Sequence, residues 1–198
     1  MGWAGSLASR LVERCDAELL RAHLEGDRLA FAELVRRHAA TLWAVALRTL
    51  SSREDAADAV QDALLHAHQR AAGCRASDSV RGWLVRIVVN ACLDRYRHNR
   101  SRPSYPMCDT ELARLPAPRD PIGDDELRLD VTSALARLPF DQRVVVVLVD
   151  MHGYPTHEVA GMLGVPVGTV KSRASRGRER LAHSLGHLRA LETTTEER

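Results

Sequence analysis

The chain has 198 residues, with 45% hydrophobic and 27% charged side chains and a net charge of +2. This mixture is typical of a globular protein and excludes a wholly disordered or collagen-like chain. The longest strictly aliphatic run, Val144 to Val149, is far shorter than the ~20 apolar residues of a membrane-spanning helix, so no membrane span is predicted.

The charge is unevenly distributed along the chain. Residues 1–102 carry 16 basic and 12 acidic side chains, residues 103–126 carry 2 and 6, and residues 127–198 carry 10 and 8. Five of the eight prolines also fall within 103–126, and proline removes a backbone donor and breaks helices. We therefore predict two domains joined by a Pro-rich acidic linker.

The N-terminal residues and the cysteines indicate the compartment. Residues 1–10 have neither a basic segment nor a continuous apolar run, so no secretory signal is expected and the protein is predicted to be cytoplasmic. The four cysteines lack the close spacing of zinc ribbons and redox dithiols, which predicts free thiols. They are Cys15, Cys74, Cys92 and Cys108.

The first domain is predicted to be helical throughout, with helices over 16–23, across 31–46, over roughly 52–72 and from 80 to about 100. The second of these has apolar residues at helical spacing: Phe31, Leu34, Val35, Leu42, Val45 and Ala46. Ser51 and Glu54 have the spacing of a capping box that opens the third. After a break at 73–79, the fourth has a predicted buried stripe: Val80, Leu84, Ile87 and Ala91.

Two polar surfaces of this domain carry functional information. The third helix has one side of carboxylates and a glutamine: Asp55, Asp58, Gln61 and Asp62. The fourth helix has a polar stripe opposite its buried one: Arg86, Asn90, Asp94 and Arg97. A basic stripe with an asparagine suits a phosphate backbone and a base edge, whereas the acidic side needs a basic protein surface. Ordinary solvated helix faces are the open alternative.

The second domain is also predicted to be helical. Leu127 to Leu138 has helical spacing and leads into Val144 to Val149, which we predict to be a buried helical segment. Residues 156–163 and 169–185 are predicted helices separated by a short Gly-containing turn, which is the organisation of a helix-turn-helix. The predicted fold class is therefore all-α, with two small helical domains.

The last helix has the composition of a DNA-recognition helix. Val170, Ala174 and Leu181 lie on its inner side, and five basic residues fall within 171–180. Its outer side and flanks carry the candidate DNA contacts: Lys171, Ser172, Arg173, Ser175, Arg176 and Arg178. A membrane-surface or calmodulin-binding helix needs a broad apolar side, which this helix lacks. The pattern therefore predicts DNA binding.

Taken together, these segments resemble the extracytoplasmic-function (ECF, group 4) sigma factors of bacterial RNA polymerase, within the sigma-70 family. The likeness covers about residues 16–188. It is carried by Asp55-Ala-Ala-Asp-Ala-Val-Gln-Asp62, Trp83-Leu-Val-Arg-Ile-Val-Val-Asn90 followed by Asp94-Arg95, Leu138-Pro139, and Gly168-Thr-Val-Lys-Ser-Arg173. Ile87 to Asp94 is most similar to the actinobacterial M-type members.

The resemblance implies a role for each polar surface. The acidic side of the third helix would bind core RNA polymerase at a basic coiled coil of its largest subunit. Asn90, with the loop 73–79, would hold a base flipped from the single-stranded minus-10 element of promoter DNA, with Asp94 and Arg97 beside it. The six polar residues of the recognition helix would contact the minus-35 duplex. The resemblance also implies an anti-sigma partner, no enzymatic activity, and no cofactor or metal.

The composition and the extent of the likeness together set the domain limits: a mobile N-terminal extension (1–15), a sigma-2-like domain (16–102), the linker (103–126), a sigma-4-like domain (127–188) and a mobile tail (189–198). In this family the linker runs through the RNA path of the polymerase, where the acidic composition would mimic the transcript electrostatically. A solvated tether is the alternative.

One departure from the family and two other functions remain to be tested. Pro155 stands where a Ser or Thr commonly caps the first helix of the helix-turn-helix, so that helix is expected to start late, with Thr156 as the replacement cap. Asp62 and His66, with His68 nearby, have the spacing of a metal-binding pair, which would fit a metal-dependent enzyme. A stand-alone helix-turn-helix regulator would bind its promoter without polymerase.

Overall fold

The computed structural model describes residues 11, 13–74, 79–101 and 125–186, and these residues form helices and no strand. The predicted all-α class is therefore confirmed. No helix in these ranges is long and apolar enough to cross a membrane. Most of the predicted extension (1–15), linker (103–126) and tail (189–198), and Cys108, lie outside the described residues. Cys15 and Cys92 are free thiols, as predicted.

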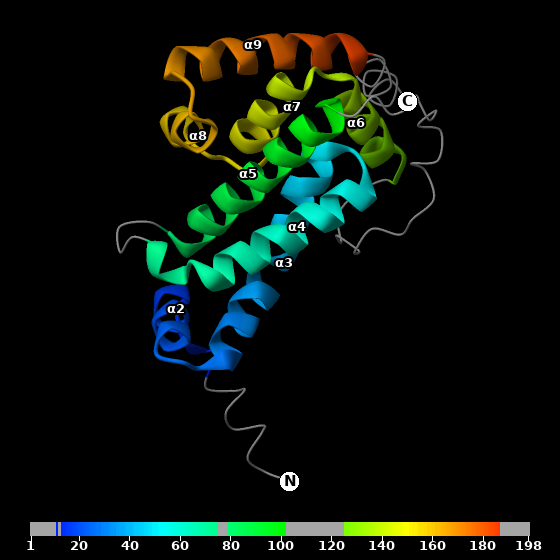
Figure 1. Ribbon diagram of the computed structural model, residues 1–198. Coiled ribbons are helices and arrows are strands. Elements are labelled where there is room, and N and C mark those ends of the chain that lie inside the picture. The colour runs from blue at the N-terminus through cyan, green and yellow to red at the C-terminus, as the bar shows by residue number, and fades with distance from the viewer. Residues whose placement is uncertain (1–10, 12, 75–78, 102–124, 187–198) are drawn as a thin grey trace, which may run out of the picture.

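The N-terminal domain is a helical bundle built around its longest helix. In chain order its elements are α2 (Asp16–Leu24), α3 (Arg28–Leu50), α4 (Arg53–Gln69), the 3-10 turn η1 (Ala71–Gly73) and α5 (Val80–Ser101). In Figure 1, α4 and α5 run side by side across α3, and all three pairs are in contact. The buried side of α4 consists only of alanines, Ala56, Ala59, Ala63 and Ala67, which let the helix backbone approach its neighbours closely.

The start of α4 differs from the predicted capping box by one residue. Ser51 ends α3 in a left-handed conformation (φ 63°), with its N–H bonded to the Leu47 carbonyl. Ser52 is the residue that caps α4, because its Oγ accepts a hydrogen bond from the Asp55 N–H at 3.2 Å. The prediction placed the cap on Ser51 because the S-x-x-E spacing does not show where the preceding helix ends.

The buried side of α5 is wider than the predicted stripe. Val80 and Leu84 are buried as predicted, but Ile87 and Ala91 are only partly buried. The other buried positions are Trp83, Val85, Val88, Val89 and Cys92. This helix contacts α3 and α4 in its own domain and α8 of the C-terminal domain. A helix with neighbours on two sides buries more than one stripe, so a single-stripe prediction was wrong in part.

The C-terminal domain contains the predicted helix-turn-helix. Its elements are α6 (Asp125–Arg137), α7 (Phe140–Val146), the π-helical turn η2 (Val147–Met151), α8 (Thr156–Leu163) and α9 (Val167–Ser184). Residues Val144 to Leu148 are buried, as predicted. Pro155 is itself the residue before α8 and gives it no side-chain cap. The helix begins directly after it at Thr156, so the expected late start with Thr156 as the cap is wrong. Gly164 makes the turn before α9 in a left-handed conformation (φ 65°) that favours glycine.

The two domains pack against each other, and Figure 1 shows α9 lying across the far side of the C-terminal domain. Tyr96 of α5 and Phe140 of α7 stack with ring centroids 3.7 Å apart and planes 4° from parallel. Arg143 of α7 donates to the Thr49 carbonyl at 3.2 Å and to the Ser51 hydroxyl at the end of α3. His152, half-buried near Arg48 and Arg81, has its pKa lowered to about 4, chiefly by its partial burial.

Candidate functional site

The acidic face of α4, defined as Asp55, Asp58, Gln61 and Asp62, divides into two parts. Asp58, Gln61 and Asp62 are exposed, whereas the side chain of Asp55 is only 24% exposed. Asp55 accepts from Arg95 Nε at 2.8 Å and from Asn99 Nδ2 at 3.0 Å, both on α5. Asp58 also pairs with Arg95. Among the described residues, Gln61 and Asp62 have no such internal partner.

Arg95 and Asn99 are functional candidates that the sequence analysis missed. The hydrogen bond to Asp55 is the main reason that the pKa of Arg95 is raised, opposed by partial burial. Arg95 and Asn99 are four residues apart, so they lie on one side of α5. Opposite charges on two consecutive helices were the only signal in the sequence, and that signal does not define which side chains meet.

The polar stripe of α5 is exposed along its whole length. Arg86, Asn90, Asp94 and Arg97 all face solvent. Arg97 donates to Asp94 at 3.2 Å within the helix, and both side chains are more than 70% exposed. Asn90 has no hydrogen-bond partner among the described residues, which exclude 75–78 of the neighbouring loop. Its amide donors and acceptor are therefore available on this surface.

The outer side of α9 presents a second polar surface. Lys171, Ser172, Ser175 and Arg176 are exposed, while Val170 and Ala174 are buried beneath them. Arg176 donates to the Ser172 carbonyl at 3.2 Å, a contact within its own helix. This surface is the exposed side of the second helix of a helix-turn-helix, where side chains reach base edges.

Two of the candidate arginines on α9 have carboxylate partners in their own domain. Arg173 donates to Asp141 of α7 at 2.8 Å. Arg178 binds Asp150 of η2 through Nε and a second nitrogen, at 2.8 to 3.1 Å. The pKa of Arg178 is raised, mainly by this hydrogen bond. Asp141 and Asp150 were not predicted, because their partners lie 32 and 28 residues away in the sequence.

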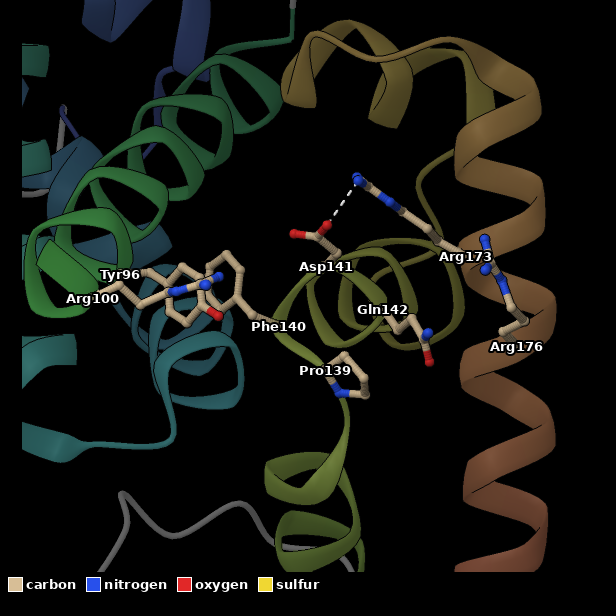
Figure 2. Close-up of a pocket in the computed structure, with 8 residues that line it drawn as sticks. All are labelled: Tyr96, Arg100, Pro139, Phe140, Asp141, Gln142, Arg173 and Arg176. Atoms are coloured by element: carbon tan, nitrogen blue, oxygen red, sulfur yellow. Dashed lines mark hydrogen bonds and ion pairs between the residues drawn. The ribbon is translucent and has the colours of Figure 1, made fainter. Parts of the chain in front are cut away.

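The C-terminal end of α5 and the middle of α9 line opposite sides of a cavity of about 440 Å³. Figure 2 shows Tyr96 and Arg100 of α5 on one side and Arg173 and Arg176 of α9 on the other, with Asp141 between them. The remaining lining residues are Pro139, Phe140 and Gln142. This juxtaposition places two basic surfaces, distant in sequence, at one interdomain groove.

No group of three or more potential metal ligands occurs among the residues that the structure describes. Asp62, His66 and His68 lie along α4, and His68 packs against Phe31 and His23 through ring contacts. The described part of the chain therefore contains no ligand cluster that would support a metal-dependent enzyme.

Comparisons with known proteins match both domains. Residues 34–102 match the family model for sigma-70 region 2, and residues 128–181 match the model for sigma-70 region 4. The chain is 50% identical over 176 residues to the ECF RNA polymerase sigma factor SigM of Mycobacterium tuberculosis, covering 89% of this chain and 87% of that protein. That relative bears out the predicted M-type subgroup.

Solved structures give the same result for the fold. The sigma factor RpoE of Bartonella quintana, in complex with the anti-sigma factor NepR, has a TM-score of 0.67 at 26% identity and covers 79% of this chain and 96% of that one. CnrH, in complex with the cytosolic domain of CnrY, has a TM-score of 0.61 at 29% identity and covers 87% and 97%. Region 2 and region 4 on one chain distinguish this protein from a stand-alone regulator.

Proposed function

Because the chain belongs to the extracytoplasmic-function sigma factors, which direct transcription initiation, we propose that its three polar surfaces divide the work of promoter recognition. The acidic face of α4 binds core polymerase, the polar stripe of α5 reads the minus-10 element, and α9 reads the minus-35 element. The observation that carries this proposal is the charge: an exposed acidic face lies in the region 2 match, and an exposed basic face lies on the second helix of the region 4 match.

Core polymerase binds the acidic face through a basic protein surface. The exposed members Asp58, Gln61 and Asp62 supply the attraction, and their sign excludes the DNA backbone as the partner. Asp55 links the acidic face to α5, because its carboxylate accepts hydrogen bonds from that helix. The catalytic chemistry belongs to the polymerase, and this chain supplies sequence choice and strand opening.

On α5, Asn90 captures one unstacked base of the melted minus-10 strand. A single amide offers two donors and an acceptor, which suits the Watson-Crick edge of a flipped base. Arg97 holds the nearby backbone, and Asp94 fixes Arg97 through their hydrogen bond at 3.2 Å. This arrangement needs single-stranded DNA, since a base inside a duplex does not expose that edge.

On α9, the exposed side chains enter the major groove of the minus-35 duplex. Lys171 and Ser172 lie near the N-terminal end of α9 and Arg176 lies one turn further along, and these three contact base edges. Ser175 lies beside them on the same exposed side. Arg173 and Arg178 contact phosphates. Arg173 shares its charge with Asp141, and Arg178 shares its charge with Asp150.

The remaining features follow from the family. The domains extend over 16–102 and 127–188, and the linker (103–126) mimics the transcript within the polymerase. The protein works in the cytoplasm, where the polymerase is. The similar sigma factor RpoE is in complex with the anti-sigma factor NepR, and this chain has a regulatory partner of the same kind.

Run-off transcription with core polymerase tests the proposal. Core polymerase with this protein should produce a discrete transcript from a cognate promoter, and neither component alone should do so. Footprinting by the protein alone, as tight as footprinting with polymerase present, would instead identify a stand-alone regulator.

A further inference from the structure

Arg143 of α7 joins the two domains. One of its terminal nitrogens donates to the Thr49 carbonyl at 3.2 Å and to the Ser51 hydroxyl, both at the C-terminal end of α3. The other donates to the carbonyls of Ala136 and Leu138 at 3.0 and 3.1 Å, within the C-terminal domain. None of these acceptors is a carboxylate, and burial lowers the pKa of Arg143. A single guanidinium therefore ties the end of α3 to the C-terminal domain.

The polar part of this domain interface is incompletely bonded. Buried side-chain atoms without a hydrogen-bond partner include Thr49 Oγ1, Arg143 Nε and His152 Nε2. Thr49 and Arg143 meet across the interface. The His152 ring lies near Arg48 and Arg81 of the N-terminal domain. A polar atom that has left water without gaining a partner costs free energy. Separation of the domains would therefore recover part of the free energy that it costs.

The packed arrangement places the two DNA-candidate helices too close together for both promoter elements. By their positions these elements are about 25 base pairs apart, which is about 85 Å of B-form DNA at 3.4 Å per base pair. Arg100 of α5 and Arg176 of α9 line the same cavity (Figure 2). Asn90 lies only about 15 Å along α5 from Arg100. DNA of this length is stiff, because its persistence length is about 150 base pairs. The packed domains can therefore contact one element at a time but not both.

The chain is long enough for the two domains to separate. Because α5 ends at Ser101 and α6 begins at Asp125, residues 102–124 join the domains. Twenty-three residues can reach at most about 80 Å when fully extended. Added to the width of the domains themselves, that reach is sufficient for the 85 Å between the elements.

We propose that Arg143 is the latch of a closed state: in the free protein it holds the two domains together, so that one chain cannot contact the minus-10 and minus-35 elements at once. The proposal rests on the proposed function, because it takes α5 and α9 as the helices that read these elements. Two contacts made by one chain strengthen each other through effective concentration, and the closed state prevents this gain. Core polymerase, which supports recognition of both elements, must therefore separate the domains.

The experiment compares the full-length protein with the variants Arg143→Met and Arg36→Met. Arg36 is the control, because its guanidinium is exposed and bonded to Glu33 of its own helix. Small-angle X-ray scattering measures whether the domains separate in each protein. Binding of each protein without polymerase is then titrated on three DNA fragments. One carries the minus-10 element as a preformed bubble, one carries the minus-35 duplex, and one carries both at the natural spacing.

Arg143→Met should have a larger radius of gyration than wild type, because the ties from α7 to Thr49 and Ser51 are removed. It should also bind the fragment with both elements at least about tenfold more tightly than either single-element fragment. Wild type and Arg36→Met should stay compact and gain little from the second element. A folded Arg143→Met protein that stays compact, or a wild type that already shows the tenfold gain, would overturn the proposal.

Ser51→Gly weakens the latch from the other domain. Ser51 has a φ of 63°, which glycine adopts readily, so the substitution removes the hydroxyl acceptor without straining the end of α3. It should give the same changes as Arg143→Met by a smaller factor, about threefold, because only one hydrogen bond is lost. If Arg143→Met does not fold and Ser51→Gly behaves as wild type, the proposal is wrong.

The single-element fragments distinguish failure of the latch from failure of the proposed function. If the opened variants prefer neither element over unrelated DNA, α5 and α9 do not read these elements and the proposed function is refuted. If they prefer each element but gain nothing from having both on one fragment, only the latch is refuted.

Discussion

On α4 the internal partners of the charged face come from α5, which itself carries candidate DNA contacts, whereas on α9 they come from α7 and η2, which carry none. Asp55 and Asp58 therefore bind a helix that has a separate task. Arg173 and Arg178 bind Asp141 and Asp150, acids of the supporting helices. The difference indicates that the α4 surface can be coupled to another site, while the α9 surface is a self-contained unit.

The effect of reversing the α4 charges should be the largest. Asp58→Lys together with Asp62→Lys turns attraction into like-charge repulsion, so core polymerase binding should weaken by about 3 kcal/mol or more, roughly 100-fold. Co-purification with core polymerase measures the loss, and circular dichroism should show unchanged helical content. Glu25→Lys, at an exposed acid beyond the end of α2, is the charge control. Retained binding by a folded double variant would contradict the docking assignment.

The two arginines of α9 with different partners should behave differently. Among the described residues, the hydrogen bonds of Arg176 stay within α9. Arg176→Ala should therefore lose about 1–3 kcal/mol of DNA-binding free energy and relax base preference at one or two minus-35 positions. Arg178→Ala should weaken binding to all DNA sequences alike and reduce the slope of log affinity against log salt concentration by about one. Binding titrations over a minus-35 mutant series measure both effects. Identical specificity profiles would mean that the helix lies differently in the groove.

Asn90 and Asn99 provide a matched pair of amides on α5. On a preformed bubble, Asn90→Ala should lose about 1 kcal/mol and alter the preference at one non-template base, because its hydrogen bonds to that base are removed. Asn99→Ala should leave that preference unchanged, since its amide is bonded to Asp55. Wild-type preference in Asn90→Ala, or loss of thermal stability alone, would show that Asn90 is structural.

The smallest expected effect concerns the packing of α9 against α7. A Cβ on Gly177 would lie 2.6 Å from Val146 Cγ2 of α7. Overpacking costs about 1–3 kcal/mol and the helix propensity of alanine recovers about 1, so Gly177→Ala should destabilise the protein by roughly 1 kcal/mol. Val146→Ala should relieve the clash in the double variant.

Gly161 of α8 is the control for that prediction, because a Cβ there meets nothing within 4 Å. Gly161→Ala should raise the melting temperature slightly, by the helix propensity alone. If Gly177→Ala also raises it, the close approach of α7 and α9 is not rigid, and the self-contained character of the α9 surface is wrong.

Local periodicity in the sequence determined most of the helices, the helix-turn-helix and the exposure of the candidate residues. Spacing along one helix depends only on residues within a few turns, so Asn90, Arg97, Lys171 and Arg176 could be placed on outer surfaces without a structure. The motifs and their order along the chain were sufficient to identify the family, because each motif is a local pattern in the sequence.

Only the tertiary structure decided which charges meet. Arg95 reaches Asp55 across 40 residues of sequence, and Arg143 reaches Ser51 across 92. Such contacts depend on the packing angle and register of whole helices, which periodicity does not encode. For the same reason the start of α4 and the wide buried side of α5 were misplaced: both depend on where a neighbouring element ends or packs, and not on the pattern of the helix itself.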